Sequence, residues 1–210
     1  MVRIAHISDT HIRNLKFHKQ YKVAFEDMYE QLRELKPDYI VHCGDIAHRK
    51  TDISPELVDM TNDFIKNLAD IAPTHIILGN HDGNLRNETR QDAISPIISA
   101  MDNDNVYLYK NSGEFDIGDN IVLNVLSVFD KNSWLTTPSN NEKINIALYH
   151  GSVAGCKTET GFMMEHGIDI SELEKFDYAM LGDIHKTNQR LDHDGRVRYC
   201  GSTIQQNHGE

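Results

Sequence analysis

The sequence lacks a long apolar run, and it lacks cysteines spaced for pairing. No apolar stretch approaches the roughly 20 residues that span a bilayer, so we expect no membrane partner. Arg3 and His6 interrupt the short apolar start, which is not typical of a secretory signal. The 3 cysteines form no Cys-x-x-Cys pair and cannot all be bridged. We therefore expect reduced thiols in a cytoplasmic protein, or one in the host cytoplasm if its source is a phage.

The chain also has little positive charge. It carries 21 Lys and Arg against 32 Asp and Glu, for a formal net charge of −11. Proteins that bind nucleic acid without specificity normally need a basic surface, so this balance argues against a DNA-processing role. Bound divalent cations or a basic partner would offset part of the charge. In other respects the composition, 39% apolar and 25% charged over 210 residues, is that of one ordinary globular domain.

The order of apolar patterns predicts an α/β fold. Apolar residues three and four apart predict a helix that ends at Pro37, with an inner face of Phe17, Tyr21, Ala24, Met28, Leu32 and Leu35. Ser54 and Pro55 predict the start of a second helix, with Leu57, Thr61, Phe64 and Leu68 inside. A third helix is expected over Glu88–Met101, limited or kinked by Pro96.

Short apolar segments between these helices and after them predict strands. They are Val2–Ile7, Tyr39–Cys43, His75–Leu78, Val106–Tyr109, Phe115–Ile117, Ile121–Val128, Ile144–Tyr149 and Tyr178–Leu181, followed by a hairpin of Arg190–Leu191 and Val197–Tyr199. Units of strand, helix and strand followed by hairpins favour a layered sandwich of two mixed β-sheets flanked by helices. We expect residues 1–210 to form one domain.

Five of the predicted strands end in side chains that bind metals. The segments are Ser8-Asp9-Thr10-His11, Gly44-Asp45-Ile46-Ala47-His48, Gly79-Asn80-His81-Asp82, His150-Gly151 and Gly182-Asp183-Ile184-His185. In open α/β sheets, binding sites form at the carboxyl ends of the strands. Any one of these segments is common by chance, and a lone histidine at a strand end is usually structural. All five in order predict a metal site.

The residue types at these ends suit hard and borderline divalent cations. Carboxylate and amide oxygens bind hard cations, and imidazole extends the range to manganese, iron and zinc. In an extended segment, Asp9 and His11 lie on the same side, so both can reach one ion. Asp45 has oxygens to spare and could bridge two ions about 3.5–4 Å apart. Glycines at 44, 79, 151 and 182 allow sharp turns beside the site.

These residues resemble the signature of the calcineurin-like phosphoesterases. The matching positions are Asp9, His11, Asp45, Asn80, His81, His150 and His185. Within that superfamily, the chain looks most like SbcD-type nuclease subunits of DNA double-strand-break repair complexes. The features that carry this likeness are the start Asp9-x-His11, the position of His48 three residues after Asp45, and the segments Gly182-x-Ile184-His185-Lys186 and Tyr199-x-Gly201-Ser202. The resemblance runs from Ile4 to about Ser202.

The resemblance implies a role for each position. Asp9, His11 and His185 are expected to hold a first ion, Asn80 and His150 a second, and Asp45 both. His81 is expected to act on the leaving oxygen, and His48 to orient the substrate phosphate. Asp183 stands where the family usually has histidine, as a ligand of the second ion. Because aspartate is the harder ligand, we expect two Mn²⁺ ions, with Mg²⁺ or Fe²⁺ as alternatives.

Basic residues near the same loops are candidate contacts for DNA phosphates. They are Arg13, Lys16, Arg49, Arg86, Arg90 and Lys186. The alternative interpretation of each is a solvated surface charge.

The family resemblance implies a nuclease of recombination and double-strand-break repair. Its expected activities are 3′-to-5′ exonuclease and endonuclease on single strands or hairpins. The expected partners are DNA, an SMC-like ABC ATPase of the SbcC type, and a second copy held by helices around Pro55–Ala69 and Glu88–Met101. Two alternatives remain open, namely a phosphodiesterase or phosphatase for small molecules or phosphoproteins, and a non-catalytic scaffold. Because the sequence ends soon after the last motif, we expect the capping and ATPase-binding regions to be absent.

Overall fold

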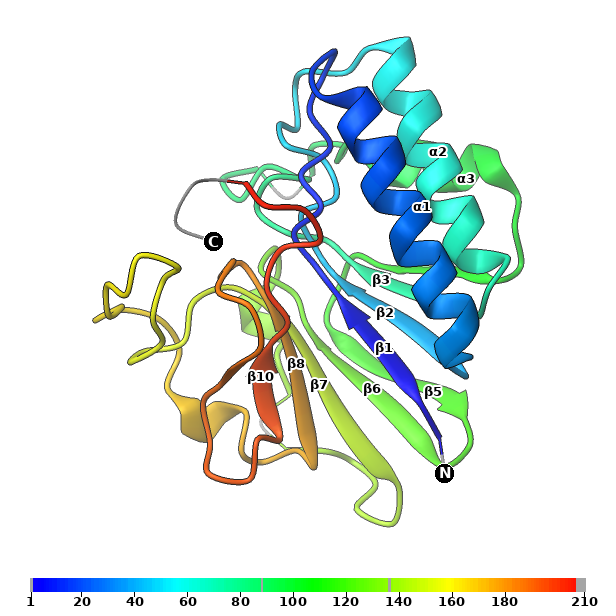
Figure 1. The fold of residues 1–210 in the computed structure, drawn as a ribbon. Coiled ribbons are helices and arrows are strands. Elements are labelled where there is room, and N and C mark those ends of the chain that lie inside the picture. The colour runs from blue at the N-terminus through cyan, green and yellow to red at the C-terminus, as the bar shows by residue number, and fades with distance from the viewer. Residues whose placement is uncertain (1, 88, 136, 207–210) are drawn as a thin grey trace.

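Two β-sheets face each other in the computed structural model, which describes residues 2–87, 89–135 and 137–206 (Figure 1). The first sheet has the order β1-β2-β3-β4 and is parallel throughout. Its strands are β1 (Ile4–Ile7), β2 (Tyr39–Cys43), β3 (Thr74–Ile77) and β4 (Val106–Tyr109). All four lie where the apolar patterns predict them, to within two residues at either end.

The second sheet is mixed and has the order β5-β6-β7-β8-β10-β9. Its strands are β5 (Gly113–Gly118), β6 (Ile121–Leu126), β7 (Ile144–His150), β8 (Tyr178–Gly182), β9 (Gln189–Arg190) and β10 (Val197–Tyr199). The four central strands are parallel, and the edge strands β5 and β9 pair antiparallel with their neighbours. The hairpin predicted near the end of the chain is therefore present.

The helix α1 (His18–Leu35) packs on the outer face of the first sheet through one stripe of side chains. The buried members of the stripe are Tyr21, Phe25, Tyr29 and Leu32. The predicted inner face was partly wrong, because Phe17 and Leu35 are 57% and 60% exposed. Phe17 lies just before the helix in a left-handed conformation. The helical spacing that predicts its burial therefore does not apply to it.

The helix α2 (Pro55–Ala69) begins and packs as predicted. The Ser54 hydroxyl accepts a hydrogen bond from the Leu57 N–H at 3.2 Å, and Pro55 occupies the first helical position. Such a cap satisfies an N–H group that the helix itself leaves unpaired. The four predicted inner residues are all buried.

The third helix is shorter than predicted. Only α3 (Ser95–Met101) is helical, and the expected start at Glu88 lies outside the described residues. The Asp92 carboxylate accepts hydrogen bonds from the N–H groups of Ile94 and Ser95, and Pro96 lies in the first turn. The proline therefore begins the helix instead of kinking it, as its missing N–H allows at this position.

The core has three parts, which correspond to the layers. The helices cover the outer face of the first sheet, and a second cluster lies between the sheets, where Val41 and Ile77 meet Leu123 and Leu148. The outer face of the second sheet is covered by the segment of residues 151–176, which includes only the short 3₁₀ helix η2 (Ile170–Glu172). The predicted layered α/β sandwich is confirmed, with its α-helices on one side only. A second 3₁₀ helix, η1 (Lys131–Ser133), follows β6.

Within the described part of the chain, none of the helices combines the length and apolar character needed to cross a bilayer.

Candidate metal centre

The loops after β1, β2, β3, β7 and β8 meet at one edge of the two sheets. Beyond β1, the Asp9 N–H donates to the Gly44 carbonyl at 3.0 Å and the His11 N–H to the Asp45 carbonyl at 2.9 Å. Across the gap between the sheets, His150 Nδ1 lies 2.7 Å from the Cys43 carbonyl. The Asp183 N–H donates to the Asp9 carboxylate at 3.1 Å. These contacts hold together the loops after β1, β2, β7 and β8, and the loop after β3 is joined to them through Asp82, which accepts from the Asp45 N–H at 2.8 Å.

The first donor cluster consists of Asp9, His11, His185 and Asp45. The Nε2 atoms of His11 and His185 lie 3.1 Å apart, and each is 3.7 Å from Asp9 Oδ1. Asp45 Oδ2 lies 3.5 Å from His11 Nε2. The side chains of Asp9 and His11 are almost fully buried, whereas that of His185 is 20% exposed. Solvent can therefore reach the cluster from the side of His185.

The second donor cluster consists of His150, Asn80, Asp183 and the same Asp45. His150 Nε2 lies 3.0 Å from Asn80 Oδ1, 3.3 Å from Asp45 Oδ2 and 3.9 Å from Asp183 Oδ1. One oxygen, Asp45 Oδ2, therefore belongs to both clusters. This grouping, with Asp45 shared, is the one that the family resemblance implies for these residues.

The donor atoms fit two divalent cations. Because a carbonyl only accepts, His150 Nδ1 must donate to Cys43, which leaves the lone pair of the neutral ring on Nε2. That lone pair faces the oxygens of Asn80 and Asp45, which also only accept. A shared proton or a cation has to lie between such atoms. In the first cluster, the Nε2 atoms of His11 and His185 lie so close that a shared proton or a cation must also lie between them.

The ionisation of the site indicates an excess of negative charge. Burial raises the pKa of Asp9 to about 6, and it raises the pKa of Asp183 as well. Burial acts against a charged His150, yet the carboxylates of Asp45, Asp9 and Asp183 raise its pKa well above the ordinary value. The buried carboxylates therefore favour a positive charge at this centre, either as a proton on His150 or as a bound cation.

The backbone at the candidate ligands is strained. Asp9, His11, Asp45 and Asp183 have φ angles of 53°, 47°, 59° and 93°. Residues other than glycine seldom adopt this left-handed region, although Asp and His do so more often than most. Such conformations cost free energy and cluster at functional sites, where surrounding contacts hold them. Here the strain turns each side chain from its strand end toward the common centre.

Two glycines at the site are required for close packing and not for sharp turns as predicted. A Cβ at Gly79 would collide with the Asp45 carboxylate, and one at Gly182 would collide with the Cys43 carbonyl and the Ser8 hydroxyl. Neither glycine has a left-handed φ angle. The absence of a side chain at these positions is what lets Asp45 and the two sheets approach one another.

The buried carboxylate of Asp82 is a structural part of the site that the sequence analysis missed. Its oxygens accept hydrogen bonds from the N–H groups of Asp45 at 2.8 Å, Ala47 at 2.9 Å and Gly79 at 2.9 Å. Burial and the nearby Asp45 charge raise the pKa of Asp82 to about 7. The only signal in the sequence is its place directly after Asn80 and His81. Its role depends on contacts that the sequence does not reveal.

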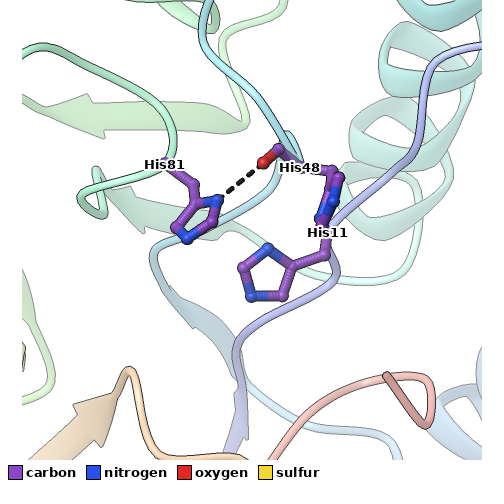
Figure 2. Close-up of side chains that lie close together, drawn as sticks. All are labelled: His11, His48 and His81. Atoms are coloured by element: carbon purple, nitrogen blue, oxygen red, sulfur yellow. Dashed lines mark hydrogen bonds between the residues drawn. The ribbon is translucent and has the colours of Figure 1, made fainter. Parts of the chain in front are cut away.

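The predicted catalytic residues His81 and His48 lie beside the first donor cluster (Figure 2). His81 Nδ1 donates to the His48 carbonyl at 2.6 Å, and the His81 N–H donates to Asp45 Oδ1 at 2.8 Å. The ring centres of His11 and His81 lie 4.8 Å apart. His81 is therefore held by the two loops that also carry Asp45 and Asn80.

Two adjoining cavities gather part of the predicted basic set. Arg13, Lys16 and Arg49 line a cavity of about 120 Å³ together with His48. His48 and Arg49 also line the neighbouring cavity of about 270 Å³, with Lys50, Asn80 and His81. Arg86 and Arg90 are exposed on the loop before α3, Lys186 follows His185, and none of these three lines either cavity. The basic residues that line these two cavities thus come from the loops after β1 and β2.

The chain is similar to two known proteins over nearly its whole length. It is 40% identical over 222 residues to the Uncharacterized protein R555 of Acanthamoeba polyphaga mimivirus, covering 99% of this chain and 16% of that protein. It is 23% identical to the DNA double-strand break repair protein Mre11 of Methanocaldococcus jannaschii, covering 94% of this chain and 55% of that protein. The chain thus spans about a sixth and about half of these relatives.

The chain is also similar to one solved structure and matches the profile of one protein family. The crystal structure of Pseudomonas putida nuclease MPE matches with a TM-score of 0.39 and 18% identity, covering 67% of this chain and 57% of that chain. The profile of the family described as "Calcineurin-like phosphoesterase" matches residues 2–187. The chain therefore belongs to the calcineurin-like phosphoesterase family.

Proposed function

We propose that this metallophosphoesterase is a two-metal nuclease that hydrolyses phosphodiester bonds of DNA. The observation that supports it best is Asp45 Oδ2, which lies within 3.5 Å of a ring nitrogen in each donor cluster. Calcineurin-like phosphoesterases bind two divalent metal ions, and a carboxylate common to two donor sets is what an ion pair about 3.5–4 Å apart needs. The family makes the chain a metal-dependent hydrolase, and the DNA substrate is our proposal.

The proposed ligands follow the two clusters. Asp9, His11 and His185 bind the first ion, Asn80, His150 and Asp183 bind the second, and Asp45 binds both. The mixture of three carboxylates with imidazole and amide donors suits Mn²⁺, with Mg²⁺ and Fe²⁺ as the alternatives. When bound, such ions supply Lewis-acid stabilisation of the charge on the phosphate.

His81 is the proposed general acid. Its Nδ1–H is engaged by the His48 carbonyl, so Nε2 is the nitrogen that exchanges a proton with the leaving oxygen. The same hydrogen bond fixes the orientation of the ring. His48 faces both basic cavities and is the residue we assign to holding the substrate phosphate.

DNA is favoured as substrate by the local charge. Arg13, Lys16, Arg49 and Lys50 line the two cavities next to His48 and His81, although the whole chain has a net charge of −11. Phosphate contacts of this kind position a nucleic-acid backbone. The similarity to a protein named for DNA double-strand break repair, over 94% of this chain, points to the same substrate.

The remaining features of the proposal rest on family resemblance. They are 3′-to-5′ exonuclease and single-strand or hairpin endonuclease activity, an SMC-like ABC ATPase of the SbcC type as partner, a second copy of the chain, and a cytoplasmic location. A groove of about 430 Å³ between α2 and α3, lined by Ile53, Val58 and Ile97 among others, lies where the second copy is proposed to bind.

The alternative activity is a phosphodiesterase or phosphatase for small molecules or phosphoproteins, which the acidic balance of the chain favours. To separate the two, we would assay Mn²⁺-loaded protein on single- and double-stranded oligonucleotides, a chromogenic phosphodiester and a phosphoprotein, with metal content measured on the same sample. We expect oligonucleotide cleavage that Asp45→Asn abolishes together with metal binding, while the exposed Asp116→Asn changes neither. Hydrolysis of the small diester or the phosphoprotein alone would reject the nuclease. Two bound ions without turnover on any substrate would favour the scaffold.

A further inference from the structure

A third group of possible metal donors lies next to the two donor clusters. It is formed by the rings of His11, His48 and His81, each of which has a ring nitrogen within 4.8 Å of those of the other two. Figure 2 shows the three rings at the corners of a triangle, with one nitrogen of the His11 ring turned toward the other two rings. His48 and His81 belong to neither donor cluster, so their grouping with His11 is a separate feature.

Two buried nitrogen atoms in this three-histidine group lack a hydrogen-bond partner among the described residues. They are Nδ1 of His11, whose residue is 3% exposed, and Nδ1 of His48. His11 Nε2 faces Asp9, Asp45 and His185, which leaves Nδ1 as the atom turned toward His48 and His81. Burying an unpaired ring nitrogen costs free energy, and a bound ligand would remove that cost.

The third ring offers its lone pair in the same direction. Because His81 Nδ1–H donates to the His48 carbonyl at 2.6 Å, the neutral ring carries its lone pair on Nε2. The group thus offers imidazole nitrogens and no carboxylate of its own. An all-imidazole donor set suits zinc and similar borderline cations better than manganese or magnesium.

We propose that His11, His48 and His81 form a zinc-type cation site that competes with the first donor cluster for His11. Tetrahedral zinc has nitrogen ligands at about 2.0–2.1 Å, so the three nitrogens must move closer together than they lie here. The carboxylates of Asp9 and Asp45 behind His11 favour binding of a cation at this site. The positive charges of Arg13 and Arg49 beside His48 oppose that binding.

Competition follows from the chemistry of one imidazole. A neutral ring has a single lone pair, so His11 binds a cation either through Nε2, in the first donor cluster, or through Nδ1, in the three-histidine site. With Nδ1 bound, the proton lies on Nε2 and is donated to the nearby carboxylates. Zinc at this site therefore removes His11 from the first cluster and occupies the nitrogen that His81 would use as an acid. The predicted loss of catalysis on zinc binding rests on the proposed function, but the binding of zinc does not.

The test measures displacement of manganese without any substrate. Full-length protein loaded with Mn²⁺ is titrated with Zn²⁺ at buffered free concentrations, and released Mn²⁺ is followed by its EPR signal. We expect His48→Asn to leave Mn²⁺ affinity within about twofold and to raise the zinc concentration that displaces half of the first manganese at least about 10-fold. The matched control His193→Asn, whose side chain is fully exposed, should behave as wild type.

Two outcomes would overturn the site. Equal zinc potency in wild type and His48→Asn would mean that zinc acts only by replacing manganese in the donor clusters. Anomalous scattering at the zinc edge from soaked crystals should show a peak between the three rings, and peaks confined to the two donor clusters would exclude it. A failure of DNA cleavage would reject the proposed function while leaving both of these measurements interpretable.

Discussion

Asp45 is the residue on which the site depends most. Its Oδ1 accepts the His81 N–H at 2.8 Å, and its Oδ2 faces His11 and His150 in the two donor clusters. Burial opposes its ionisation, but the charges of His150 and His11 lower its pKa below the ordinary range. One side chain thus connects both proposed ions with the proposed acid, so substitution here cannot separate metal binding from catalysis. His81 allows that separation.

Substitution of His81 by asparagine should reduce turnover and spare the metals. General acid catalysis typically contributes 10²–10⁴-fold, so we expect His81→Asn to lose about 10³-fold in kcat while binding both ions. Metal content by mass spectrometry and cleavage rate are measured on the same preparation. A substrate whose leaving group needs no proton should be cleaved at close to the wild-type rate. Loss of one ion in His81→Asn would make His81 a ligand and end its assignment as the acid.

Protonation of His75 should make stability depend on pH away from the site. Burial lowers the pKa of His75 to about 4 from its ordinary 6.5, and its ring stacks on Tyr107 while Nδ1 lies 2.8 Å from the Tyr109 hydroxyl. Between pH 6.5 and 4 the unfolded chain takes up a proton that the folded chain does not. Stability is therefore complete above pH 6.5 and is lost as the pH falls through this window.

The variant His75→Phe removes this proton uptake and keeps an aromatic ring against Tyr107. Since one pKa unit corresponds to about 1.36 kcal/mol, the difference in unfolding free energy between pH 7.5 and 4.5 should shrink by roughly 2 kcal/mol. Denaturant unfolding at both pH values measures it, with the exposed His193→Phe as control. An unchanged difference would show that His75 already titrates normally in the folded chain.

The candidate ligands could be predicted from the sequence because each follows a short apolar strand. The carboxyl ends of parallel strands share an edge, so Asp9, Asp45 and Asn80 had to meet if β1, β2 and β3 paired in parallel. His150 follows β7 in the second sheet, and its approach to the other three depends on how the two sheets pack. The left-handed φ angles and the role of Asp82 could not be predicted. Both depend on how loops from different strands pack on one another.

At the scale of elements, Asp82 connects the loops after β2 and β3. Asp82→Asn replaces one acceptor oxygen by an NH₂ group, which would face N–H groups of Asp45, Ala47 or Gly79. We expect the loops to separate and Mn²⁺ affinity to fall 10–100-fold, as typically follows loss of a group that orients a ligand. Equilibrium dialysis measures the affinity, and circular dichroism checks the fold. Asp92→Asn, which alters the start of α3 instead, is the matched control and should keep its affinity.

Strands were more predictable than helices in this chain. The parallel strands are short, apolar runs bounded by polar loops, so their limits are visible in the sequence. The predicted stripe of α1 includes the buried Tyr21 and Leu32 but omits Phe25 and Tyr29, because spacings of three and four allow several faces and only packing selects among them. The predicted helix begins earlier, but the Asp92 carboxylate, which accepts from the N–H groups of Ile94 and Ser95, and Pro96 in the first turn start α3 later.

At the scale of the whole molecule, the α-helices lie on one side and leave an apolar groove between α2 and α3. Val58 lines this groove and is 36% exposed, and Ile53 at its rim is 50% exposed. Exposed apolar surface of this kind is typical of protein–protein contacts. We interpret the groove as the surface that a second copy of the chain covers.

Charge placed in the groove should therefore weaken self-association without unfolding the chain. We expect the protein to sediment as a dimer and Val58→Glu to raise the dimer dissociation constant at least about 10-fold, because association would bury an unpaired carboxylate. Val58 is already partly exposed, so the melting temperature of the monomer should change little. The control is Val23→Glu on α1, 74% exposed and outside the groove. If the wild-type chain is a monomer at every concentration, or if Val23→Glu weakens the dimer as much as Val58→Glu does, the groove is not the dimer contact. A selective effect of Val58→Glu would assign α2 to the dimer contact.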